Sequence, residues 1–176
     1  METENPDVES QQVAIQLMFT MAGGATKEVS ALSTWFIGGV GALLAVVVNG
    51  AEALTPFFHL EYLSDAIRMF IGAAAINVLQ RWIGAMVTGA VDVSKEVQKL
   101  FEGGKFSPKS RVVALKIIAD RSTPPVTWMM RKSMRSMEKG DLVAGAVNIA
   151  RLSQIQSVLL IPQFALLGLA AWVLIP

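Results

Sequence analysis

The stretch that decides the fold is residues 29–51, VSALSTWFIGGVGALLAVVVNGA, which contains no charged side chain. A helix needs about 20 mostly apolar residues to cross the hydrocarbon of a bilayer, so this stretch is long enough. Trp35 and Phe36 lie near one end, and aromatic rings favour the level of the lipid headgroups. The sequence therefore predicts a transmembrane helix at this position.

Two further stretches have the same character. Residues 69–91 are apolar apart from Arg81 and its neighbours Asn77 and Gln80. Residues 152–176 carry no charge, and Pro162 should kink a helix there because its ring removes a backbone donor. The three stretches predict an all-α membrane protein with about three transmembrane helices.

Arg81 is the exceptional residue of the second predicted span. A charge at the centre of a span costs at least ~2.5–3.5 kcal/mol on insertion scales. Arg81 could face a partner helix, snorkel to an interface, or belong to a helix that lies only partly in the membrane. We expect a true span in which Arg81 turns towards protein, and we class Asn77, Gln80 and Arg81 as intramembrane polar residues.

Small residues recur at helical spacing in the first two spans. Such residues let helix backbones approach closely, although glycine is also common in spans without a packing role. The candidate packing residues are Gly38, Gly41, Ala42 and Ala45 in the first span, and Ala85 and Gly89 in the second.

Charge is strongly segregated along the chain. The net charge is only +1, but residues 93–151 hold twelve of the fifteen Lys and Arg residues. The connection 52–65 holds three acids and no Lys or Arg. Because basic residues stay on the cytoplasmic side, we expect a multi-pass protein of the inner (plasma) membrane whose N-terminus is cytoplasmic. The expected organisation is an N-terminal segment 1–28, a transmembrane hairpin 29–92, a basic cytoplasmic segment 93–151 and a final span 152–176.

The two segments outside the spans show amphipathic patterns. Val13, Leu17, Met18 and Met21 share one helical face, and Gly23-Gly24 should end that helix before the first span. The basic segment predicts helices, one of which carries a methionine stripe beside a basic face. Its candidate contacts with the membrane surface or a partner are Met130, Arg131, Met134, Arg135 and Lys139. The alternative is that this stripe simply covers a neighbouring helix.

Motifs for catalysis, metal binding and cofactor binding are missing. The chain has no cysteine and one histidine, His59, with no second ligand at metal-site spacing. No phosphate-binding loop, nucleophile elbow or zinc-protease motif is present. The basic residues lie between predicted membrane spans, which argues against an interface for nucleic acid. We therefore expect no enzyme activity, no cofactor, no metal and no direct binding of nucleic acid.

The function that this pattern favours is a non-enzymatic subunit of a larger membrane assembly, in contact with lipid and with other membrane subunits as a homo- or hetero-oligomer. The size and span pattern of the whole chain resemble the small polytopic inner-membrane proteins of conjugation and type IVB secretion machines. That resemblance implies a role in building a DNA- or protein-transfer channel, and it assigns no residue. The alternative is a pore-forming or membrane-disrupting protein, holin-like or an anti-phage effector, with Asn49, Asn77, Gln80, Arg81 and Thr88 lining a lumen. A small transporter ranks last, because no internal repeat is seen.

Overall fold

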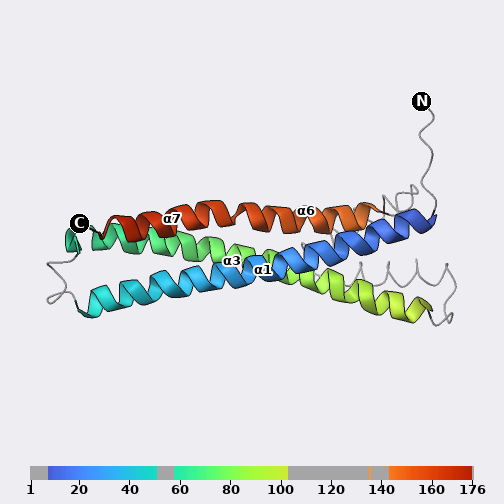
Figure 1. Ribbon diagram of the computed structural model, residues 1–176, viewed down its shortest axis with the longest axis horizontal. Coiled ribbons are helices and arrows are strands. Elements are labelled where there is room, and N and C mark those ends of the chain that lie inside the picture. Colours follow the sequence, from blue (N-terminus) through green and yellow to red (C-terminus); the bar gives the residue numbers. More distant parts are fainter. Residues whose placement is uncertain (1–7, 51–57, 103–134, 136–142, 176) are drawn as a thin grey trace, which may run out of the picture. The chain divides into compact units, whose positions relative to one another are not determined.

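A computed structural model describes residues 8–50, 58–102, 135 and 143–175. These residues are almost entirely helical and include no strand. The elements in chain order are α1 (Val8–Asn49), the short 3-10 helix η1 (Leu60–Tyr62), α3 (Leu63–Glu102), α6 (Ala144–Val158) and α7 (Leu160–Trp172) (Figure 1). Within the described ranges, three helical segments are long and apolar enough to cross a membrane: Ser10–Asn49, Leu63–Glu96 and Ala144–Trp172. This confirms the predicted fold class.

The predicted break at Gly23-Gly24 is wrong. Helix α1 runs through both glycines without interruption, so no separate amphipathic helix precedes the first span. A glycine in a helix interior costs only about 0.5–1 kcal/mol relative to alanine, which packing can offset. A Cβ built on Gly23 would lie 3.5 Å from Val91 Cγ1, an ordinary van der Waals contact, so Gly23 of α1 packs against α3 in the first unit.

Helix α3 extends beyond the second predicted span. It continues through the described residues to Glu102. Near this end Lys99 Nζ donates a hydrogen bond to Glu96 Oε1 at 2.8 Å. The hydrogen bond and the negative charge of Glu96 raise the pKa of Lys99 above its ordinary value. Both side chains are exposed, so this pair contributes little to stability.

The chain divides into two compact units. Residues 1–24 and 86–153 form the first unit, and residues 25–85 and 154–176 form the second. In the first unit the described buried side chains are small or branched, and Ser153 Oγ donates to the backbone oxygen of Ala22 at 3.2 Å. The second unit contains most of the three predicted spans and is the part that positions the candidate site.

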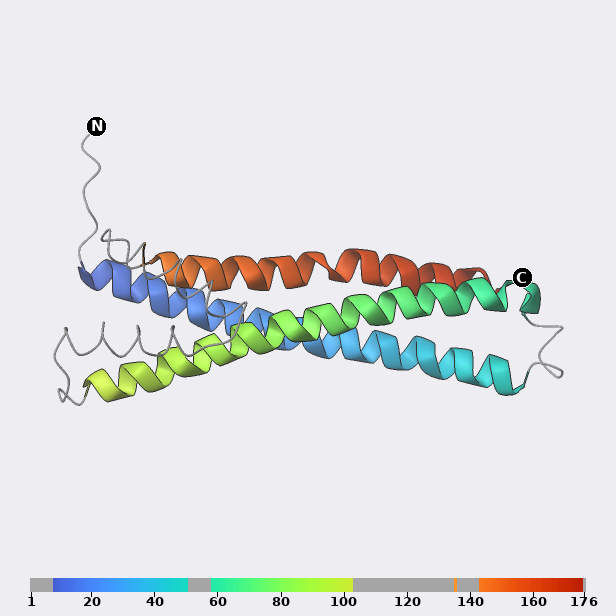
Figure 2. The ribbon, with the colours of Figure 1, turned by 180° about the vertical axis from the view of Figure 1, so that it is seen from behind.

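Three helical segments pack side by side in the second unit. Here α1 and α7 run in the same direction and α3 runs in the opposite direction, as the colour order shows (Figures 1 and 2). Phe36 of α1 contacts Phe164 of α7, with ring centroids 4.3 Å apart. A Cβ built on Gly41 of α1 would lie 3.1 Å from the ring of Phe70 in α3. A Cβ built on Gly72 of α3 would lie 3.3 Å from Leu166 Cδ1 of α7. Each helix of this unit therefore lies against the other two.

The buried positions recur every third or fourth residue. In α3 they include Ala66, Ala73, Asn77, Gln80 and Gly84, and the other two helices follow the same rule. A repeat of this kind keeps one seam of each helix facing its partners, as in left-handed coiled coils. Glycine-rich and polar seam positions then bring the helices close enough for contacts between side chains across the bundle.

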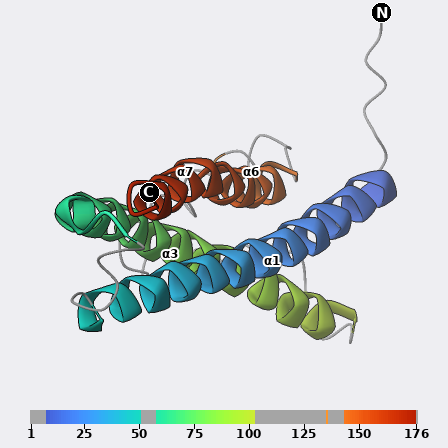
Figure 3. The same ribbon diagram turned by 60° about the vertical axis from the view of Figure 1, so that its left-hand side comes forward.

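One end of the second unit is closed by apolar side chains. Leu44, Ala66, Ala170 and Leu174 form a buried cluster against which Phe58 and Phe70 pack. The N–H of His59 donates to the backbone oxygen of Leu174 at 3.1 Å. This bond ties the end of the C-terminal helical segment to the start of α3, and the two ends lie together in Figure 3.

Pro162 interrupts the third helical segment by a single residue. Helix α6 ends at Val158 and α7 begins at Leu160, while Leu159 keeps right-handed helical angles of φ −66° and ψ −15°. Gln163 N–H reaches the oxygen of Leu159 at a long 3.4 Å. The proline thus loosens the helix as predicted, because it has no N–H to offer the carbonyl four residues earlier.

Candidate functional site

Polar side chains gather on the buried seam of the second unit, where the flanking sequence is apolar. We call this set the polar seam. Its members are Thr26, Ser30 and Ser33 of α1, Asn77 and Gln80 of α3, Gln156 of α6 and Gln163 of α7. All are buried except Ser30, which is partly buried. A buried polar group is costly unless it is hydrogen-bonded, so the partners of these side chains decide what the seam does.

Ser33 joins all three helices. Its Oγ donates to Gln163 Oε1 at 2.8 Å and accepts a short hydrogen bond from Asn77 Nδ2. Ser33 is 1% exposed. Among side chains of this size, only the hydroxyl of serine or threonine can donate and accept a hydrogen bond at the same time. Ser33 therefore links α1, α3 and α7 at one level along their axes within this unit.

A second contact point surrounds Gly84. Gln156 Nε2 donates to Ser30 Oγ at 3.1 Å across the helices. A Cβ on Gly84 would lie 3.0 Å from Gln156 Nε2 and 3.3 Å from both Ser30 Oγ and Thr26 Cγ2. A hydrogen at this position leaves the space in which the amide of Gln156 reaches α1, so Gly84 is required by packing.

Four buried amide atoms of the seam have no hydrogen-bond partner among the described residues. They are Nε2 and Oε1 of Gln80, Oε1 of Gln156 and Nε2 of Gln163. These three side chains are at most 1% exposed. The seam is therefore only partly satisfied, and it ends at the apolar cluster of Leu44, Ala170 and their neighbours.

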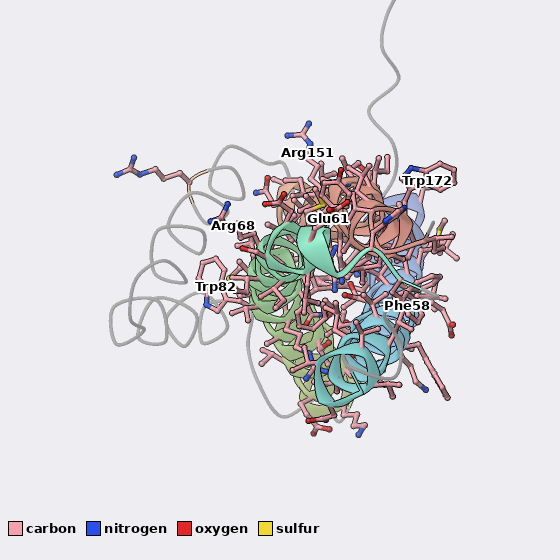
Figure 4. All side chains as sticks on the ribbon, turned by 90° about the vertical axis from the view of Figure 1, so that its left-hand side faces the viewer. Phe58, Glu61, Arg68, Trp82, Arg151 and Trp172 are labelled. Carbon is pink, nitrogen blue, oxygen red and sulfur yellow. The ribbon has the colours of Figure 1, made fainter. Side chains whose placement is uncertain are left out.

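Arg81 lies outside the seam on the surface of the unit. Its Nη2 donates to Thr34 Oγ1 at 2.9 Å, and both side chains are exposed. The Thr34 hydroxyl in turn donates to the backbone oxygen of Ser30 at 2.7 Å. Trp82, the next residue, points away from the helices, as does Arg68 (Figure 4). Adjacent residues of α3 thus divide, with Gln80 inside and Arg81 outside.

The predicted packing residues are mostly not used within the chain. Gly38, Ala42, Ala45, Ala85 and Gly89 are exposed, and Cβ atoms on Gly38 and Gly89 would meet nothing within 4 Å. Gly41 alone of the set is partly buried, against Phe70. Close approaches between helices occur at Gly41, which the sequence pattern singled out, and at Gly84, which it did not.

The exposed small residues of α1 share one face. Ala31, Thr34, Gly38, Ala42 and Ala45 are spaced by three or four positions and are all exposed. We call them the outer face of α1. On a helix this face is roughly opposite the buried positions Val29, Ser33 and Leu44, given 3.6 residues per turn. Arg81 reaches this face through Thr34.

The other candidate residues do not add a site. Met130, Arg131, Met134 and Lys139 lie outside the described residues, and Arg135 is helical and exposed. His59 Nδ1 lies 3.8 Å from Glu61 Oε1, and both side chains are largely exposed. No group of three His, Cys, Asp or Glu that could hold a metal occurs in the described part of the chain.

Several seam residues were missed by the sequence analysis. Thr26 and Ser33 are seven residues apart, as are Gln156 and Gln163. A seven-residue repeat of polar residues inside an apolar stretch indicates one buried seam, and it could have identified these four positions.

Comparison with protein-family models, curated proteins and solved structures finds no match to this chain.

Proposed function

We propose that this chain is a non-enzymatic, multi-pass subunit of a multiprotein assembly in the cell inner membrane. The observation that carries the proposal is the outer face of α1, whose side chains are small and exposed and on which a Cβ at Gly38 would meet nothing within 4 Å. Small residues on an outward face are poor at filling space against lipid but allow another helix to approach closely. The seam meanwhile holds the subunit together, so its outer face is free to bind neighbours.

The kind of assembly that we propose is a conjugation or type IVB secretion channel. Support comes from the resemblance in size and span pattern, and from segregated charge that favours a cytoplasmic N-terminus. In such a machine this chain would supply packing surface in the membrane, not chemistry. Deletion of the gene should then abolish transfer of DNA or protein, and the wild-type chain should restore it.

Crowding the outer face tests the proposal directly. Gly38→Leu adds a large side chain where no neighbour lies within 4 Å in the single chain, so the fold should tolerate it. Gly168→Leu is the matched control, because Gly168 of α7 is equally open. We expect native electrophoresis of membranes extracted in polymer nanodiscs to show a large complex for the wild type and for Gly168→Leu, and a much smaller particle for Gly38→Leu.

The absence of cysteine allows a second readout. A single cysteine at position 42 that carries a photoactivatable cross-linker should form adducts with a second protein in native membranes, whereas one at position 168 should not. A wild-type chain that extracts as a monodisperse monomer, and gives no cross-link from position 42, would overturn the proposal.

A pore-forming function is the second candidate, and the polar seam favours it. Asn77 and Gln80, two of the predicted lumen residues, lie inside the second unit, whereas Asn49, Arg81 and Thr88 are exposed. Conduction through the seam would require the apolar cluster of Leu44 and Leu174 to open. Induced expression with a membrane-potential dye separates the two functions, because an intact potential at high expression excludes a pore.

A further inference from the structure

Arg81 places a positive charge on an outward surface inside an apolar span. Thr34, which accepts its hydrogen bond, belongs to the uncharged stretch 29–51. Lys27 lies seven positions before Thr34, or about 10 Å of helix at 1.5 Å per residue. Asn49 lies fifteen positions after it, or about 22 Å. If residues 29–51 cross the membrane as proposed, the Arg81 guanidinium lies within the depth of that span, closer to its Lys27 end than to its Asn49 end.

The described residues provide no counter-ion. No carboxylate among them lies within 4.0 Å of Arg81. In the second unit, Asp65 pairs with Arg68 at 3.4 Å, about 24 Å of helix from position 81. Glu28 lies beside Lys27 at the nearer end of the uncharged stretch, six positions or about 9 Å of helix before Thr34, and it forms no ion pair with Arg81. Among the described residues, the single hydroxyl of Thr34 leaves most of the five guanidinium donors and the charge of Arg81 without a partner.

The shape of the surroundings suits a helix. Thr34 is followed on the same face by Gly38, Ala42 and Ala45, so a neighbouring helix can approach the backbone of α1 beside the charge. A second copy of this chain would be a poor occupant. Two-fold pairing on this face brings two Arg81 groups together in a medium of low dielectric, where like charges repel strongly.

We propose that the outer face of α1 and Arg81 bind a transmembrane helix of a different protein that carries an Asp or Glu within its span. The carboxylate pairs with the Arg81 guanidinium, and the small residues of α1 accept the body of the helix. This inference rests on the proposed function and deepens it, because it names the chemistry of the neighbouring subunit.

Synthetic transmembrane helices of leucine and alanine test the proposal without knowledge of the natural partner. Each peptide carries Glu, Gln or Leu at the depth of Arg81, and is mixed with the full-length chain in zwitterionic phosphatidylcholine vesicles. Energy transfer between labels on peptide and protein measures the affinity. We expect the Glu peptide to bind the wild type at least ~10-fold more tightly than the Gln peptide.

Substitutions at Arg81 assign the preference to the guanidinium. Arg81→Gln should remove the preference for Glu, while Arg81→Lys should keep part of it, because the charge remains but the bidentate geometry is lost. Circular dichroism of each variant checks that the helices are retained. Equal binding of the Glu and Gln peptides, or a Glu preference that survives in Arg81→Gln, would overturn the proposal.

Two further arms test other occupants. If phosphatidylglycerol stabilises the wild type but not Arg81→Gln, and abolishes binding of the Glu peptide, the site binds an anionic lipid and the proposal is wrong. It is also wrong if a cysteine at position 42 forms homodimers in vesicles that contain only this chain. The proposed function fails separately, when Gly38→Leu leaves the native assembly at its full size.

Discussion

Gln80 carries two buried amide atoms without a hydrogen-bond partner among the described residues, at a position that is 1% exposed. A buried polar atom without a hydrogen bond lowers the free energy of unfolding by about 1–3 kcal/mol. A side chain of similar length without the amide would avoid that cost.

Gln80→Met should therefore stabilise the protein. Methionine is unbranched and fills the same space, so we expect the free energy of unfolding to rise by about 1–2 kcal/mol. Steric trapping in bicelles measures this quantity. A lower free energy of unfolding would show that Gln80 has a partner that this substitution removes.

Ser33→Ala should have the opposite effect. It removes the hydrogen bonds to Asn77 and Gln163, and it leaves one polar atom of each without its partner. Hydrogen bonds between membrane helices average ~0.6 kcal/mol and reach about 1.7, so we expect a loss of about 1–2 kcal/mol. The same bicelle assay tests this, and an unchanged stability would mean that Ser33 does not join the three helices.

The sequence identified Asn77, Gln80 and Arg81 as intramembrane polar residues but could not separate them. Asn77 shares a helical face with a residue three or four positions later, so Gln80 and Arg81 were equally good companions. The structure decides between them through packing against α1 and α7, which the local pattern does not contain. Arg81 was expected to turn towards protein; in the described part of the chain it is exposed and donates a hydrogen bond to Thr34.

At the scale of the elements, the roles of the small residues also depend on packing between helices, which the local sequence pattern does not contain. Length and hydropathy were enough to predict three helical segments that are long and apolar enough to cross a membrane. They were not enough to show that α1 passes through Gly23-Gly24, since helix continuity depends on tertiary contacts such as that of Gly23 with Val91. Nor did they show that Gly84, next to the expected Ala85, makes the close approach.

Gly84→Ala should separate the helices at that point. The added Cβ would lie 3.0 Å from Gln156 Nε2 and would push the amide away from Ser30. Overpacking of this kind costs about 1–3 kcal/mol. Thermal unfolding in detergent should register the loss, while Gly168→Ala, which has open space, should change stability by no more than about 0.5 kcal/mol.

A double substitution checks the cause. Because the closest atom belongs to the flexible end of Gln156, adding Gln156→Ala to Gly84→Ala should recover part of the lost stability. Fully additive losses would place the clash elsewhere.

At the scale of the whole molecule, we predict that the chain crosses the membrane three times, which would put residues 1 and 176 on opposite sides. The twelve Lys and Arg residues between 93 and 151 predict that this segment is cytoplasmic. Green fluorescent protein fused before residue 1 should fluoresce, because it is fluorescent on the cytoplasmic side. Alkaline phosphatase fused after residue 176 should be active, because it is active on the external side. The reverse pair of results would invert the topology.

The proline break in the C-terminal helical segment has a mechanical consequence. A helix bends most easily where a backbone hydrogen bond is missing. Helices α1 and α3 have no proline break within the same unit. Changes in bilayer thickness should therefore be absorbed by flexing near residues 158–162, upstream of the Gln163 contact with Ser33. The two helices that present Arg81 and Gly38 would keep their curvature as the lipid changes, so the surface offered to a neighbour would stay constant in membranes of different composition.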